Sequence, residues 1–330
     1  MHVCPINPGQ LLATKPAPGP EEQGRQDLDL KDDCLRNMLA KPLALETLAL
    51  KRCRHPHERL ALALSILVIL GSVLLALRLG RADVIVTLAG IWAAMFLTSL
   101  SAKTYDRLRG AEVTETQFPD LYRLVKDVGR RLDTPTTRVF VIRRSEAGAH
   151  AYGFRAPYVL VLYSDLLDTL SPDELKTVVG FHMARITYGH TRVALLLGGD
   201  ESTLPAVLSW LAWARNLVFV WYRRLEVLSA DRGAVLVSRD LNTAFQTCVK
   251  LSVGTAQAPS VIASELIEQA RKTNRRRDRM QTGLITLQSA TPPLLLRLEA
   301  MIEWSRLSAP REKPPRTEEA LHAPTPQPTA

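Results

Sequence analysis

The chain has 330 residues and a formal net charge of +9, and hydrophobic residues make up 46% of it. A mean hydropathy near zero beside 42 basic and 33 acidic residues is unusual for a soluble protein, so the apolar residues must gather in a few segments. The four cysteines, Cys4, Cys34, Cys53 and Cys248, are widely separated. This spacing excludes a disulfide framework and favours a reducing compartment.

The N-terminal part of the chain does not have the pattern of a folded domain. Residues 1–30 contain Pro, Gly, Gln and charged residues without apolar periodicity, and we predict that they are disordered. The basic-then-apolar order of a secretory signal is missing, so nothing indicates cleavage. Residues 31–59 are compatible with a helix and end in a basic cluster, as expected of a juxtamembrane segment.

Two uncharged apolar runs follow, Leu60–Leu77 and Val84–Ala102. Each is close to the roughly 20 residues that a helix needs to span a bilayer. Few soluble helices are apolar on every face over such a length, so a transmembrane hairpin over residues 60–102 is favoured over a buried soluble hairpin. Basic residues flank the hairpin on both sides and also occur in its loop. We predict an integral protein of the bacterial inner membrane, with its globular domain facing the cytoplasm.

Residues 103–308 have the pattern of a mainly helical α+β domain with a small β-sheet. Short β-branched and aromatic runs predict strands at Arg138–Arg143 and Tyr158–Tyr163. Helices are predicted at Phe118–Leu132, from Ser171 to about His190, at Trp221–Ser238 and at Asn242–Val253. The second helix begins with Ser as N-cap, Pro at the first helical position and acids in the first turn.

The segment Leu204–Tyr222 is long enough to span a membrane but carries Arg215 in its middle. If this segment crossed alone, the helices before and after it would lie on opposite sides of the membrane. We therefore expect it to pack on the domain or to lie in the membrane interface, with Trp210 and Trp213 as packing or anchoring residues. Residues 309–330 are rich in Pro, Thr and charge and are predicted to be a disordered tail.

Several separated blocks occur in a distinctive order after the hairpin: SDLLDTLSPDELKTVVGFHMARITYGHTR, YRRLEVLSADRGAVL, VKLSVG and TPPLLLRLEAM. Together they resemble the membrane zinc metallopeptidases of the HtpX heat-shock protease type, over roughly residues 60–305. The resemblance implies a zincin-like metallopeptidase fold. It also implies the proteolytic activity of that family, which serves membrane protein quality control.

The first catalytic motif of that family is degenerate here. The family has HExxH followed by xxxGH, in which two histidines on one helix face bind zinc and the glutamate activates water. Anchoring on Gly189-His190 places Phe181 at the first histidine, His182 at the glutamate and Arg185 at the second histidine. A guanidinium at that position would repel a divalent cation in a low-dielectric cleft.

The second motif is degenerate as well. The family's third ligand is the glutamate of ExxAD, and this chain has Val227 four residues before Asp231. Glu226 is one residue away, about 100° around a helix. We therefore expect no catalytic residue, no bound metal and no cofactor. We further hypothesise that Arg185 pairs with Asp231 or Glu226, so that the guanidinium replaces the metal as a cross-link between two helices.

Other parts of the family's cleft have counterparts in the sequence. The edge-strand block "NA(F/Y)" appears as His150-Ala151-Tyr152, and the C-terminal "HPP…R" block appears as Thr291-Pro292-Pro293 with Arg297. The candidate binding residues of the cleft are Ala151, Tyr152, Arg185, Asp231 and Arg297.

Three functions fit this pattern. The first is an inactive pseudopeptidase whose cleft binds membrane-associated proteins or peptides, or which regulates an active homologous peptidase. The second is a zinc metalloendopeptidase with an unusual ligand set of His150, His182, Glu226 and Asp231, and zinc is expected only in this case. The third is a plain membrane scaffold. The basic run Arg271–Arg279 has no interleaved aromatics, so membrane lipid is favoured as its partner over nucleic acid.

Overall fold

The computed structural model describes residues 53–144, 148–198, 209–254 and 291–308, together with 258, 265–266 and 268–269. The predictions for residues 1–30, for most of 31–59, for Arg271–Arg279 and for the tail 309–330 lie outside these residues.

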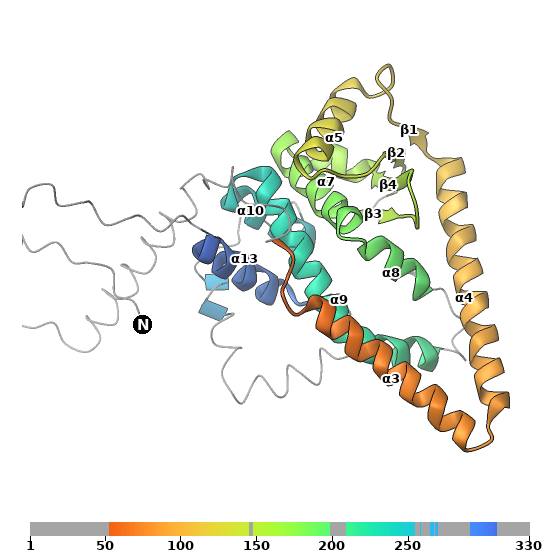
Figure 1. Ribbon diagram of the computed structural model, residues 1–330. Coiled ribbons are helices and arrows are strands. Elements are labelled where there is room, and N and C mark those ends of the chain that lie inside the picture. Colours follow the sequence, from red (N-terminus) through yellow and green to blue (C-terminus); the bar gives the residue numbers. More distant parts are fainter. Residues whose placement is uncertain are drawn as a thin grey trace, which may run out of the picture. The chain divides into compact units, whose positions relative to one another are not determined.

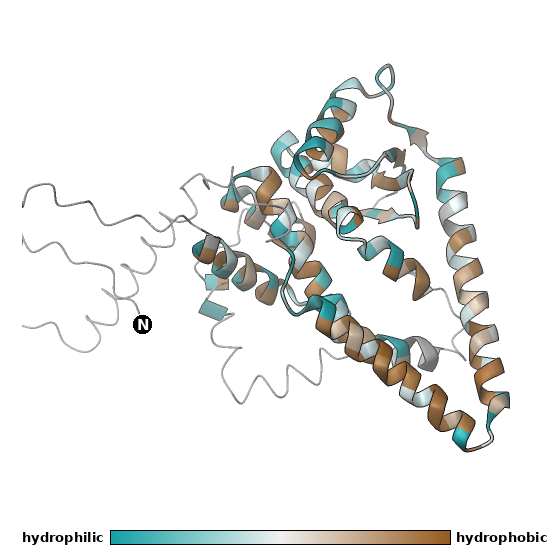
Figure 2. Cartoon of the chain, viewed as in Figure 1, coloured by the Kyte–Doolittle hydropathy of each residue, from teal (hydrophilic) through white to brown (hydrophobic). Residues whose placement is uncertain are grey.

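Two long apolar helices form the hairpin, α3 (Glu58–Arg78) and α4 (Ala82–Arg109) (Figure 1). As predicted, both are long and apolar enough to cross a membrane. Both helices are hydrophobic along most of their length (Figure 2). Most of their large apolar side chains are exposed, as expected of residues that face lipid. Helix α4 continues beyond Ala102 to Arg109, so it enters the globular domain without a break.

A four-stranded sheet lies at one side of the domain. It contains β1 (Ala111–Glu112), β2 (Thr137–Ile142), β3 (Ala149–Tyr152) and β4 (Tyr158–Tyr163). Their spatial order is β1-β2-β4-β3; β2 and β4 are parallel, and the two outer strands are antiparallel to their neighbours. Strand β3 is therefore an edge strand. One face of the sheet packs in the main core with α5 (Pro119–Arg131) and α7 (Pro172–Thr187).

Helix α7 begins at the predicted place. The Ser171 hydroxyl accepts a bond from the Glu174 amide, and the Glu174 carboxylate accepts one from the Ser171 amide, at 3.4 and 2.9 Å. The prediction that this helix continues to about His190 is wrong. Gly189 adopts a φ of +81°, a left-handed conformation that ends the helix, and His190 opens α8 (His190–Leu196).

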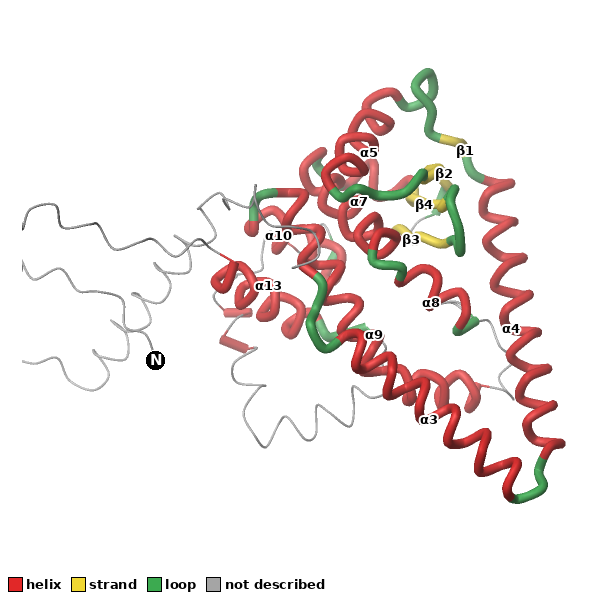
Figure 3. The backbone as a smooth tube through the Cα atoms, viewed as in Figure 1, coloured by secondary structure: helices red, strands yellow, loops and turns green. Residues whose placement is uncertain are grey.

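The structure also gives the bounds of α6 (Ser164–Thr169), α9 (Ser209–Ser238), α10 (Leu241–Val253) and α13 (Leu294–Ser308) (Figure 3). Leu204–Tyr222 and Trp221–Ser238 were predicted as separate segments, but from Ser209, where the described residues resume, a single helix α9 runs to Ser238. No Gly or Pro occurs between Ser209 and Ser238 before Gly233, so nothing in the backbone interrupts the helix. At Gly233 a Cβ would overlap Ala184 of α7, so these two helices approach closely.

A buried polar cluster joins the hairpin to the domain. Glu58, at the start of α3, is fully buried. Its carboxylate lies 2.8 Å from His190 Nε2, accepts a bond from the Ser229 hydroxyl at 2.6 Å, and also pairs with Arg54. The cluster therefore links α3 to both α8 and α9.

Candidate functional site

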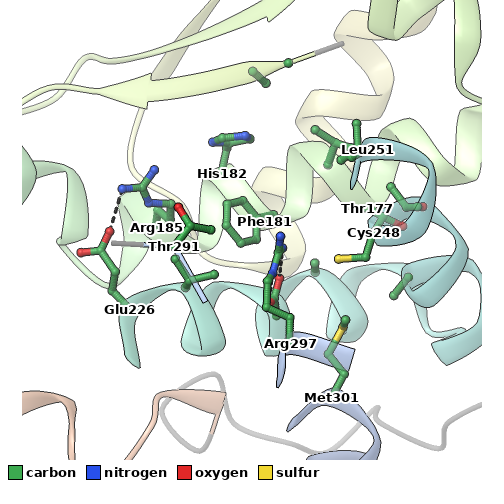
Figure 4. A pocket seen from close by; sticks show the side chains of 18 of the residues that line it. Thr177, Phe181, His182, Arg185, Glu226, Cys248, Leu251, Thr291, Arg297 and Met301 are labelled. Carbon is green, nitrogen blue, oxygen red and sulfur yellow. Dashed lines mark hydrogen bonds and ion pairs between the residues drawn. The ribbon is translucent and has the colours of Figure 1, made fainter. Parts of the chain in front are cut away.

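A cavity of about 400 Å³ lies between α7, α9, α10, α13 and the start of β3 (Figure 4). All four positions that correspond to degenerate catalytic positions line it: Phe181, His182, Arg185 and Val227. Asp231 and Arg297 line it too. The register deduced from the sequence thus brings the expected residues of α7 and α9 together around one cavity.

An ion pair crosses the cavity from α7 to α9. Arg185 Nη2 donates to Glu226 Oε1 at 2.7 Å, and the two side chains are only 11% and 5% exposed. Figure 4 shows this bond at one end of the cavity. The hypothesis that Arg185 cross-links the two helices is confirmed, with Glu226 as its partner.

Asp231 has a different partner from the one considered above. Arg297 of α13 binds both of its carboxylate oxygens, Nε to Oδ2 at 2.9 Å and Nη2 to Oδ1 at 2.6 Å. Burial alone would lower the pKa of Arg297, but the charge of Asp231 outweighs it and raises that pKa. The same guanidinium carbon lies 5.5 Å from the ring centroid of Phe181. The residue at the first histidine position therefore packs beneath an arginine.

The alternative zinc ligand set is not assembled. His182 lines the cavity with its ring edge-on to Phe181. His150 lies on the opposite face of the sheet, because successive residues of a strand alternate between faces. Its Nε2 is 3.3 Å from Asp106 of α4, and its Nδ1 is 3.2 Å from the Tyr163 hydroxyl.

The chemistry of the cavity does not fit the zinc site of the resembled family. Two of the three ligand positions carry an aromatic ring and a guanidinium, and both nearby carboxylates are paired with arginine. In the part of the chain that the structure describes, no three His, Cys, Asp or Glu side chains lie close enough to hold a metal ion. No hydrolytic step can therefore be derived from this site.

Two predicted cleft residues do not line the cavity with their side chains. Tyr152 is buried in a second apolar cluster, with Phe140 and Tyr163, on the far face of the sheet, and this burial raises its pKa. The side chain of Ala151 packs against the main core. The residues of this region that do line the cavity are Gly148 and Ala149. For Tyr152 the cause is again strand alternation, which a motif read as a block does not show; Ala151 shares the face of Ala149 but lies farther along the strand, against the core.

Sequence reasoning missed the wall that α10 contributes. Ala244, Thr247, Cys248 and Leu251 line the cavity at i, i+3, i+4 and i+7, a helical spacing that was visible in the sequence. That spacing identifies one face of a helix but not what the face contacts. Burial raises the pKa of the Cys248 thiol to about 12, so this cysteine is a neutral wall residue rather than a nucleophile.

The fold and the cavity define a membrane metallopeptidase-like protein: an apolar helical hairpin, a small mixed sheet, and a cleft between two helices at the catalytic positions. The family model of Peptidase family M48 matches residues 115–305. Because the match covers more than half of the chain, the chain belongs to peptidase family M48.

Individual relatives agree with this assignment. A protease HtpX homolog of Thermodesulfovibrio yellowstonii is 28% identical over 103 residues, which are 31% of this chain and 35% of that protein. The plastoglobule-localized metallopeptidase 48 of Arabidopsis thaliana is 24% identical over 204 residues, 59% of each chain. The resemblance to HtpX-type proteins is thus confirmed. The chain spans about one third of the length of the first of these relatives and less than two thirds of the second. The crystal structure of S. mikatae Ste24p superposes with a TM-score of 0.40 at 15% identity, over 72% of this chain and 66% of that one.

Proposed function

We propose that this chain is a non-catalytic member of family M48 whose cleft binds polypeptide segments without cleaving them. The observation that carries the proposal is the buried ion pair between Arg185 and Glu226. Arg185 stands on α7 at the position that the resemblance assigns to the second zinc-binding histidine, and its partner Glu226 lies on α9. A fixed guanidinium there opposes a divalent cation electrostatically and already holds the two helices together.

Strand β3 supplies a binding edge for an extended peptide. The Gly148 carbonyl accepts a bond from the Tyr163 amide of β4. Because the backbone groups of a strand alternate in direction, those of Ala149 and Ala151 point toward the open edge. A peptide added there would bond to these two residues, with its side chains directed into the cavity beside Ala149. In this proposal Ala151 binds through its backbone rather than its side chain.

The partners follow from where the cleft sits. The hairpin holds it close to a membrane, so the proposed ligands are segments of membrane-associated proteins, or an active homologous peptidase. We place the domain on the cytoplasmic side of the bacterial inner membrane because basic residues flank both ends of the hairpin. Membrane lipid is a further partner. No cofactor and no nucleic acid is part of the proposal.

Metal content tests the absence of catalysis. The full-length protein, purified in detergent, is analysed for zinc and other transition metals beside a His182→Ala variant. We expect far less than one metal per chain, unchanged by the substitution. About one metal per chain in the parent, lost in the variant, would overturn the proposal and point to a peptidase.

Peptide binding is tested separately at Ala151. Peptides are selected from a phage-displayed random library against the purified protein and measured by fluorescence anisotropy. Ala151→Pro removes the outward amide while leaving the β3–β4 bonds in place, and Ala151→Ser keeps that amide. We expect the proline variant to lose at least tenfold in affinity and the serine variant to match the parent. Equal binding by both variants would exclude β3 as the binding edge.

A further inference from the structure

The two ends of the cavity differ in charge. At one end Arg185 of α7 pairs with Glu226 of α9. Thr177 lines the other end and lies eight residues earlier on α7, which is about 12 Å along the helix. Figure 4 shows Thr177 and Cys248 on one side of the Phe181 ring and the ion pair on the other side. The cavity therefore has an ion-paired end at α9 and a second end between α7 and α10.

We call this second end the α10 pocket, and the described residues that line it are uncharged. Lys250 Nζ of α10 lies 2.6 Å from Glu174 Oε1 of α7, so the two helices are held side by side. Six residues of these helices line the pocket: Thr177, Val178, Ala244, Thr247, Cys248 and Leu251. Beside the pocket, Arg297 binds both carboxylate oxygens of Asp231, so these two charges neutralise each other.

The hydroxyl groups of the α10 pocket are already bonded within the protein. The Thr177 hydroxyl donates to the Asp173 carbonyl at 2.9 Å, and the Thr247 hydroxyl donates to the Thr243 carbonyl at 2.7 Å. The Cys248 thiol is neutral because burial raises its pKa. A charged side chain of a ligand would lose its hydration in this pocket without gaining a counter-charge, which is costly. The chemistry of the pocket therefore favours an apolar group.

The size of the wall residues leaves room for a large group. Four of the six residues have small side chains: Thr177, Ala244, Thr247 and Cys248. The whole cavity has a volume of about 400 Å³, whereas protein interiors are normally close-packed. Leu251 lines the cavity and is 39% exposed, so one apolar wall residue remains open to a ligand. Burial of a large apolar side chain in such a space is favourable because apolar surface leaves water on both partners.

We propose that the α10 pocket takes one large apolar side chain, of leucine, methionine or phenylalanine size, from a polypeptide bound at β3. This inference rests on the proposed function, in which an extended segment lies along β3 and directs side chains into the cavity beside Ala149. The ion pair of Arg185 crosses one end of the cavity, so the α10 pocket is the end that accepts an apolar side chain. The small residues Ala244 and Thr247 set the largest group that fits. The pocket thus selects which segments bind.

Changes in the peptide test the proposal without any change in the protein. The tightest peptide from the library is resynthesised with alanine at each position in turn, and its affinity for the full-length protein in detergent is measured. We expect alanine at one large apolar position to weaken binding about tenfold or more, and aspartate there to weaken it at least as much. Photo-leucine at that position should cross-link to residues 244–251, located by mass spectrometry. Tolerance of alanine at every position, or cross-links only elsewhere, would overturn the proposal.

Two substitutions at one position of the wall give a matched test. Thr247→Phe fills the α10 pocket with a ring of the protein itself, and Thr247→Val keeps the size of the side chain. We expect Thr247→Phe to weaken the selected peptide about tenfold or more but to leave its alanine derivative within about twofold, because that derivative does not fill the pocket. Thr247→Val should bind both peptides as the parent does. Equal weakening of both peptides by Thr247→Phe would contradict the pocket.

The variants of Ala151 separate this proposal from the proposed function. Peptides that depend on the Ala151 amide but show no effect of alanine or of Thr247→Phe would keep the binding edge and reject the pocket. Peptides that ignore Ala151→Pro but respond to both other changes would keep the pocket and reject the edge. Failure to select any peptide would overturn both proposals.

Discussion

Removing one partner of the Arg185–Glu226 pair should destabilise the domain far more than removing both. Both side chains are almost fully buried, so Arg185→Met leaves a carboxylate without its counter-charge in the cavity. Breaking a buried pair in this way costs about 3–5 kcal/mol, whereas replacing both partners with apolar residues is often close to neutral. The double variant Arg185→Met/Glu226→Met should therefore recover most of the lost stability, which is the signature of coupling between the two sites.

Thermal unfolding of the detergent-purified protein measures this cycle. For a domain of this size, about 1 kcal/mol shifts Tm by roughly 2–4 °C, so Arg185→Met should lower Tm by roughly 6–20 °C. Arg138→Met is the matched control, because its pair with Glu112 is solvent-exposed and should be worth about 1 kcal/mol or less. If Arg185→Met and Arg138→Met shift Tm equally, and the double variant shows no recovery, the buried cross-link is not a structural element.

Three further results are expected. A variant with the four family residues restored carries Phe181→His, His182→Glu, Arg185→His and Val227→Glu. It should bind about one zinc per chain by elemental analysis, and failure to gain metal would mean that the cavity is not the counterpart of the family's site. Cys248 should react with a maleimide only after unfolding, because burial raises its pKa to about 12; rapid labelling of the native protein would contradict this. Burial alone would raise the pKa of Glu174, but bonds from Lys250 and from the N-cap backbone lower it. Its contribution to stability is therefore present above the unfolded pKa of about 4.3 and lost as pH falls through the lower folded value. Glu174→Gln should thus flatten the acid limb of the stability curve, and an unchanged limb would exclude this role.

The fold was largely predictable because its signals are local. The two apolar runs, the strands β2 and β4, and the N-cap of α7 each follow from a few consecutive residues. The two errors concern where helices end. Helix α7 ends before Gly189, because this glycine adopts a left-handed φ, which the sequence allows but does not require. Helix α9 continues through the point where the composition changes from apolar to mixed. Backbone continuity depends on packing partners that the local pattern does not contain.

Part of the site was predictable, because aligning the two family motifs with the sequence showed which residues of α7 and α9 face each other. This alignment brought Arg185 and Glu226 together and put Phe181 at the cavity wall. It did not separate the two faces of β3, so Tyr152 was assigned to the wrong side of the sheet. The bidentate pair of Asp231 with Arg297 joins positions 66 residues apart, and choosing it over Arg185 required the placement of α13.

The Glu58 cluster has a consequence for how this protein can be prepared. A truncated chain starting at residue 110, after the hairpin, is the usual route to a water-soluble fragment. It would delete the acceptor to which His190 and Ser229 are bonded in the interior. The buried His190 Nε2 would then lose its partner, at a cost of about 1–3 kcal/mol, and the Ser229 hydroxyl would lose one of its two acceptors and keep the Leu225 carbonyl. The anchor is in this sense a part of the domain's interior, and the fragment should be recovered unfolded or aggregated unless the residues from Cys53 onward are kept.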